Sequence, residues 1–222
     1  MRILTRLSAL LFVVIAVLPV SAIAGPFYGG LNVGYTGGLG IHATGSFMDF
    51  TRDLPLSARF TLGYNSASAG DPYEARRNFI NDNTNGDPEK SASTWQFRFD
   101  LMFPTFTVGP QTLYLFAGPR YASYTANYNF IGGNENFDVN SNTWGAGLGF
   151  ESWFVVGDTS DFVMQLGVDW YAESKLEGHD TAYLPSGDHV NPRDGYDYET
   201  ADAAIDQPSL ELLAMVGMRF RF

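Results

Sequence analysis

The chain has 222 residues, with 24 acidic and 13 basic side chains and a formal net charge of −11 at neutral pH. A protein this acidic lacks the basic surface that displaces counterions from phosphates, so nucleic-acid binding is excluded. The chain contains no cysteine, which excludes disulfides, thiol catalysis and a lipid-modified N-terminal cysteine.

The first 24 residues have the pattern of a secretory signal peptide. They open with two arginines, continue with an apolar run, and end in the small residues Ala22 and Ala24, which suit cleavage before Gly25. The apolar run is too short for a helix that crosses a bilayer. We expect residues 1–24 to be removed during export and residues 25–222 to form one domain. Loss of the two arginines changes the net charge from −11 to −13.

Alternation of apolar and polar side chains with a period of two, the pattern of β-strands, recurs through the rest of the chain. The segments that show it are residues 27–36, 39–50, 56–65, 93–103, 112–125, 142–154, 161–173 and 210–222.

The fourth of these segments shows the alternation most clearly. Trp95, Phe97 and Phe99 share one face, whereas Arg98 and Asp100 lie on the other. The same division recurs elsewhere: bulky apolar side chains on one parity, glycine and charge on the opposite one. The chain holds 18 Phe, 12 Tyr, 4 Trp and 24 Gly, a composition that fits membrane strands with aromatic girdles.

The connections between segments alternate in length after the first, which is a short glycine turn. Those after the second, fourth and sixth segments are short, whereas residues 67–92, 127–141 and 174–207 form long polar connections. Short turns at one rim and long loops at the other are typical of a membrane barrel. An even number of strands puts both termini at the short-turn rim, which is the periplasmic one in bacteria.

Closure of the sheet into a barrel follows from the bilayer that surrounds it. Every backbone N–H and C=O in hydrocarbon must be paired, so the eighth strand must pair with the first. We therefore predict an all-β fold, an eight-stranded antiparallel up-and-down transmembrane β-barrel. The alternative is a soluble barrel of the lipocalin kind with its apolar face inside. The opposite parity, a mixture of glycine and charge, would make a poor water-facing surface for it.

The signal peptide, the first segment "FYGGLNVGYT" and the ending "MRFRF" resemble those of small bacterial outer-membrane β-barrel proteins, the group that includes the OmpA transmembrane domain, OmpX and OmpW. The resemblance implies an integral outer-membrane protein in contact with outer-membrane lipid and lipopolysaccharide. It also implies biogenesis with periplasmic chaperones and the barrel-assembly machinery, for which Phe220 and Phe222 would form the C-terminal recognition signal. We expect a monomer without cofactor or metal.

If the bulky parity faces lipid, the charged parity lines the lumen. It supplies Arg59, Arg98, Asp100, Arg120, Glu151, Asp169, Glu211 and Arg219, together with Gln165 and Glu173. The interior of an eight-stranded barrel is just wide enough to be filled by side chains, and an unpaired buried charge is costly. We expect an ion-paired network that fills the lumen. The alternative is a narrow porin-like path for ions or small solutes, in which the pairs exchange partners.

The long connections are expected to be solvated loops. Residues 174–207 carry eight acids, and "NDNTNGDPE" places Asn81, Asn83, Asn85 and Gly86 at the spacing of a calcium-binding loop. That loop lacks the leading aspartate and has Ala92 at its twelfth position, so the calcium signal is weak.

Histidine offers few candidates for catalysis. His179 and His189 lie beside acids in the acidic connection, while His42 shares a strand face with Thr44 and Ser46. A His–Ser pair could serve a lipid A- or phospholipid-modifying enzyme, but no orienting acid is identifiable. We expect no enzyme, and instead a structural, envelope-stabilising or surface-interaction role.

Overall fold

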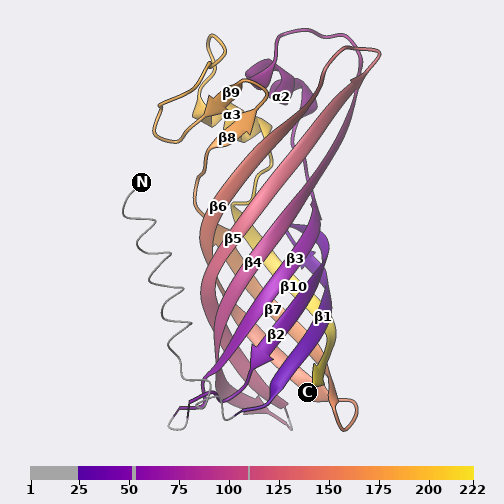
Figure 1. Ribbon diagram of the computed structural model, residues 1–222, viewed down its shortest axis with the longest axis vertical. Coiled ribbons are helices and arrows are strands. Elements are labelled where there is room, and N and C mark those ends of the chain that lie inside the picture. The colour runs from indigo at the N-terminus through magenta and orange to yellow at the C-terminus, as the bar shows by residue number, and fades with distance from the viewer. Residues whose placement is uncertain (1–24, 52–53, 110) are drawn as a thin grey trace.

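The computed structural model describes residues 25–51, 54–109 and 111–222, and the signal-peptide prediction for residues 1–24 lies outside them. Its long strands form a closed barrel that is tall and narrow (Figure 1). The barrel strands are β1 (Phe27–Thr36), β2 (Gly38–Phe47), β3 (Ser57–Ala67), β4 (Asp87–Val108), β5 (Gln111–Ile131), β6 (Asn136–Val155), β7 (Ser160–Tyr171) and β10 (Leu210–Arg221).

Every barrel strand pairs antiparallel with its neighbours, and β10 pairs with β1 to close the ring. Tyr28 lies opposite Arg221, and Val33 lies opposite Val216. The predicted fold class is confirmed, and β1, β2, β3, β7 and β10 lie within three residues of their predicted bounds. The barrel end that holds Phe27 and the chain terminus is called the lower end below.

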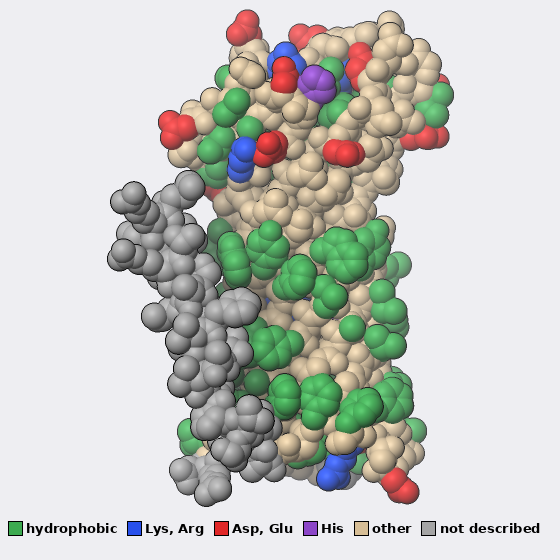
Figure 2. All heavy atoms as spheres, in the orientation of Figure 1, with side chains coloured by type: hydrophobic (Ala, Val, Ile, Leu, Met, Phe, Trp, Pro, Cys, Tyr) green, Lys and Arg blue, Asp and Glu red, His purple; other side chains and the backbone are tan. Residues whose placement is uncertain are grey.

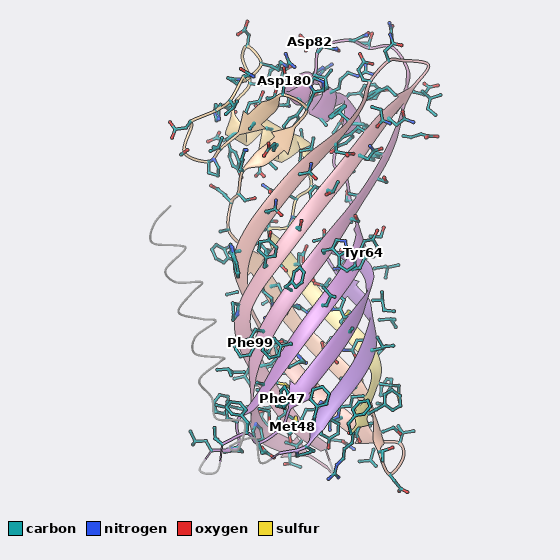
Figure 3. The ribbon with its side chains drawn as sticks, in the orientation of Figure 1. Phe47, Met48, Tyr64, Asp82, Phe99 and Asp180 are labelled. Carbon is teal, nitrogen blue, oxygen red and sulfur yellow. The ribbon has the colours of Figure 1, made fainter. Side chains whose placement is uncertain are left out.

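The outside of the barrel carries a broad apolar belt, green in Figure 2. Aromatic pairs mark its two limits. At the upper limit the ring centroids of Tyr64 and Trp95 are 5.1 Å apart, and near the lower end those of Phe27 and Phe47 are 4.9 Å apart. Figure 3 labels Tyr64 and Phe47 at these two levels. Aromatic rows at both edges of an apolar band are the girdles of a transmembrane barrel.

Above the belt the polarity of the strands is reversed. In the upper part of β5 the inward side chains are Tyr124, Tyr128 and Phe130, all buried, while Thr125 and Asn127 face outward. The prediction of a long loop at residues 127–141 is therefore wrong, because β5 and β6 continue to a tight turn at residues 132–135. The apolar side chains change parity where the surroundings of the sheet change from lipid to water. Because the alternation changes parity at this point, the sequence pattern did not indicate that the strands continue.

The reversed face supports a folded cap at the upper end. The cap consists of helix α2 (Pro72–Phe79), helix α3 (Tyr198–Ala204) and the short strands β8 (Leu176–Gly178) and β9 (Thr181–Tyr183). Strand β8 extends the sheet by pairing with β6, and β9 pairs with β8.

Side chains from the cap and the strand extensions form one apolar core. It includes Phe79, Tyr128, Leu176, Tyr183 and Ile205. The other two connections expected to be solvated loops, residues 67–92 and 174–207, are thus largely folded, because their scattered apolar residues pack on the inward face of β4–β6. Among the described residues, no helix has the length and apolar character needed to cross a membrane.

Local sequence signals begin both cap helices. Asp71 precedes Pro72 and accepts hydrogen bonds from the backbone N–H groups of Tyr73 and Glu74. Asp197 and Thr200 form a reciprocal capping box at the start of α3. These caps satisfy backbone donors that a helix start leaves free.

Replacing Phe79 by alanine tests the cap core. Phe79 is fully buried and packs edge-on against Tyr183 at 5.4 Å, so the change should destabilise the cap by about 3–5 kcal/mol. Limited proteolysis should then cut residues 68–86 faster, while heat-modifiable gel mobility shows an intact barrel. Tyr73→Ala, on the exposed face of the same helix, should have a smaller effect. Equal protection of Phe79→Ala and wild type would contradict this packing.

Candidate functional site

The structure places all eight predicted lumen residues on the inside of the barrel, each less than 10% exposed. It brings six of them into one network and leaves two apart. The network members are Arg59, Arg98, Asp100, Arg120, Glu151 and Asp169.

Ion pairs connect these six side chains in a chain of alternating sign. Arg120 lies at its centre, with Nη2 2.8 Å from Asp100 Oδ1 and Nε 2.7 Å from Asp169 Oδ1. Arg59 pairs with Asp100 at 2.7 Å and also with Glu151, and Arg98 pairs with Asp169. Three positive and three negative groups are balanced, which is the condition for keeping charges in a closed interior.

Strand register explains the pairing. Arg59 lies directly opposite Asp100, but Arg98 lies opposite Arg120 on neighbouring strands. Two arginines side by side would repel each other, so Asp169, which contacts both of them from β7, is required between them. Carboxylates on both sides convert a like-charge pair into a neutral cluster.

Gly147 makes room for this cluster. A Cβ at this position would lie 1.9 Å from Asp169 Oδ1 and 2.5 Å from Arg120 Nε. Any side chain there would displace the ion pair from its place. The glycine-rich inner parity of β6 is therefore the counterpart of the bulky arginines that face it.

Glu151 has further partners besides Arg59. Gln165 donates a hydrogen bond to its carboxylate at 2.7 Å, and the indole N–H of Trp153 also donates to it. Sequence reasoning placed Gln165 in the lumen but missed Trp153. Its indole could have been noticed because it lies two residues after Glu151, on the same strand face.

An apolar cluster adjoins the network. Met102, Phe116, Leu213 and Met215 are each at most 2% exposed and pack together inside the barrel. The Arg59 guanidinium lies over the Phe116 ring, 4.6 Å from its centroid, which joins the charged network to the apolar cluster. These buried side chains fill the part of the lumen in which they pack.

Arg219 forms a separate site near the lower end. It pairs with Asp161 at 2.7 Å, and its guanidinium lies 3.4 Å from the Trp153 ring centroid and 4.2 Å from that of Tyr28. Asp161 was missed as a partner, although it shares the inward parity of Gln165 and Asp169. The predicted strand began at Asp161, but only its later polar residues were assigned to the lumen.

Glu211 also stands apart from the arginines, near the upper mouth. It accepts hydrogen bonds from Gln96 at 2.9 Å and Thr36 at 3.4 Å, and among the described residues it has no cation within 4 Å. Its two neutral donors hold the side chain in place without joining it to the network.

His42 does not form a catalytic pair with the hydroxyls on its strand. Its Nε2 lies 3.0 Å from Asn65 Oδ1, and Gly63 on the adjacent strand leaves space for the ring. Ser46 lies four residues further along, about 13 Å away at the rise of a β-strand. His42 is thus a polar lumen residue, and its nearest partner is an amide.

The calcium-like loop already surrounds a cation of the chain. Arg76 is buried and donates to the backbone carbonyls of Asn83 and Asn85, the latter at 2.6 Å. Its guanidinium also lies 3.3 Å from the Phe130 ring centroid and 3.9 Å from Glu135. Among the residues that the structure describes, no group of three or more acids or histidines is arranged for a metal ion.

Glu135 completes this loop from the β5–β6 turn. Slight burial raises the pKa of Glu135. Hydrogen bonds from Asn81 and from the Asn134 backbone together outweigh this effect, so the pKa of the carboxyl group lies below its usual range. The carboxylate therefore stays ionised near neutral pH and ties the helix-side loop to the strand turn.

Comparisons with solved structures agree with this architecture. A major outer membrane protein from Thermus thermophilus has a TM-score of 0.72 and 21% identity, covering 90% of this chain and all of its own. Neisserial surface protein A (NspA) gives 0.45 and 13%, covering 88% and 97%, and Acinetobacter baumannii CarO2 gives 0.43 and 14%, covering 89% and 98%. No family model and no curated protein matches the chain. The chain has the fold of small outer-membrane barrels.

Replacing Arg120 by alanine tests the network. The change leaves Asp100 and Asp169 short of a buried partner and should lower the free energy of unfolding by about 3–5 kcal/mol. Urea unfolding in detergent, followed by tryptophan fluorescence, measures it. The control is Arg77→Ala, which removes an exposed ion pair with Glu74 and should cost less than about 1 kcal/mol. Similar losses in the two variants would show that the network contributes no special stability.

Proposed function

We propose that the protein is an integral outer-membrane β-barrel with a structural, envelope-stabilising role, and that its cap faces outward. The apolar belt with aromatic rows at both limits carries this proposal. A surface that exposes Leu39, Trp144 and Leu148 by more than half would aggregate in water, but it matches a bilayer. The shared fold of the Thermus outer membrane protein supports it.

The orientation follows from the two ends. The strand ends that are joined after β2, β4 and β6 lie at the end of the barrel where β1 begins and β10 ends. The two long connections form the cap at the other end. In outer-membrane barrels the short turns face the periplasm and the longer connections face outward. The charged cap would therefore meet the lipopolysaccharide headgroups and the medium.

The lumen favours a structural role over a channel. The ion-pair chain crosses the interior from β3 to β7, the apolar cluster adjoins it, and the cap packs on the inner face of the β5 and β6 extensions. An ion that crossed the lumen would have to disturb these buried pairs and the packed apolar cluster. Conduction would therefore need a rearrangement of the lumen, whereas a stabilising role needs none.

An enzymatic role has less support. Outer-membrane acyl- and phospholipid-modifying enzymes need a base beside a nucleophile, and among the described residues the one side-chain hydrogen bond of His42 is to the amide of Asn65 and not to a hydroxyl. His179 and His189 lie in the cap, where His179 contacts Asp180 on the surface and His189 accepts from the Leu184 backbone.

Single-channel recording tests the structural role against the channel alternative. The refolded full chain in planar bilayers should give no unitary steps above baseline at any voltage, because filled layers leave no continuous water path. A general porin inserted in the same bilayers is the control for detection. Discrete, reproducible steps from this protein would favour the channel.

Deleting Phe222 tests the proposed assembly signal. The ring is 81% exposed, although its backbone N–H bonds Phe27 at 3.0 Å, so its loss removes little packing. Deletion should lower barrel assembly in cells severalfold but change the stability of detergent-refolded barrel little. Phe222→Tyr keeps an aromatic terminus and should assemble normally. If assembly and refolded stability fall in parallel, the residue is only an interface anchor.

A further inference from the structure

The outward surface of β4–β6 above the belt has an unusual composition. Short amide and hydroxyl side chains dominate it, and Figure 2 shows it as a tan band between the green belt and the charged cap. We call this surface the amide face; its central residues are Ser93, Thr125, Asn127, Asn129, Asn136 and Asn140. An ordinary solvated sheet surface would carry more long charged side chains.

Strand pairing sets these side chains in a regular array. Ser93 lies opposite Thr125, which lies opposite Asn140, and in a higher row Asn129 lies opposite Asn136. Neighbours across strands are about 4.8 Å apart, and successive outward residues along a strand about 6.8 Å. Hydrogen-bonding groups are thus presented on a rigid sheet at fixed intervals.

Internal bonds orient the array without exhausting it. Thr125 donates to Asn140 at 2.8 Å, and Asn127 donates to Asn136 at 2.9 Å. Asn127 also donates to Asp138 at 2.7 Å, so both of its amide hydrogens are used, but its oxygen keeps its lone pairs. Asn140 accepts one bond and keeps both of its amide hydrogens. The amides are therefore held in position with donors and acceptors directed outward.

The amide face is also hollowed. A shallow depression of about 480 Å³ lies over Asn127, Asn129 and Asn136, with Glu89 and Ser91 at its β4 side. It is open to the outside and lined by polar side chains. A ligand of several hydroxyl groups would fit it better than an apolar one.

Aromatic side chains border the amide face directly below. Trp95 and Trp144 are 47% and 61% exposed, and the Tyr121 hydroxyl donates to Asn142 at the boundary at 3.0 Å. The face is therefore continuous with the upper girdle of the belt. Exposed aromatic rings next to amides suit a ligand with C–H surfaces and hydroxyl edges, which is the chemistry of a pyranose ring.

We propose that the amide face docks the saccharide part of a glycolipid anchored in the outer leaflet. This inference rests on the proposed membrane location, which puts the sugars next to the acyl chains at the height of the face. Amides and hydroxyls, with the carboxylates of Asp138 and Glu89 as further acceptors and Lys90 as a donor, match sugar hydroxyls. A protein partner would need an apolar centre that this face lacks. Lipid bound along the belt would bring its saccharide over the hollow without further search.

Binding of defined lipids by the full chain tests the proposal. Native mass spectrometry from detergent would compare lipopolysaccharide that carries a complete core oligosaccharide with lipid A that lacks it. Wild type should bind the core-bearing lipid about tenfold more tightly, the size expected for about two net hydrogen bonds. The double variant Asn127→Ala/Asn140→Ala should lose most of this preference. Asn134→Ala, an amide in the β5–β6 turn outside the array, should keep it.

Heat-modifiable gel mobility of each variant shows whether the barrel is intact. Equal affinity of wild type for the two lipids, with an intact barrel, would overturn the saccharide proposal and leave the membrane barrel standing. An unchanged preference in the double variant would also overturn it, because the sugar would then bind elsewhere. Failure of the wild-type barrel to insert into lipid would overturn both proposals.

Discussion

Backbone pairing governs this molecule, because a sheet surrounded by hydrocarbon has no water to satisfy a free edge. The β1–β10 ladder removes that edge, with nine residue pairs from Tyr28–Arg221 to Thr36–Leu213. Closure fixes an interior that only eight strands surround, and the width of that interior sets what it can contain. The balanced charges, the apolar cluster and the glycines beneath the arginines are all consequences of a narrow closed ring.

The interior is organised in layers that depend on each other. Arg120 needs both Asp100 and Asp169, and its pair with Asp169 needs the space that Gly147 leaves. Arg59 joins the charged network to the apolar cluster through the Phe116 ring. A barrel filled in this way is stabilised from within, and its conversion to a pore would require several layers to move together.

Above the belt the same strands carry a different distribution of side chains. Their outward side chains there are amides and hydroxyls, and the aromatic side chains point inward. The cap packs on that inner face, and Arg76 fills the loop that resembles a calcium site by binding the carbonyls of Asn83 and Asn85. The rigid extension then presents the amide face at a fixed height above the upper girdle.

The sequence by itself determined the strand number, the closed barrel and the inward position of the charged residues, because period-two alternation is local and the bilayer penalises every other arrangement. It also indicated that buried arginines and carboxylates would have to pair. Only the tertiary structure decided which ones do, since Arg120 reaches Asp169 from a strand two positions away in the sheet. The cap and the long β5–β6 extension escaped prediction because their apolar residues become a core only when distant segments meet.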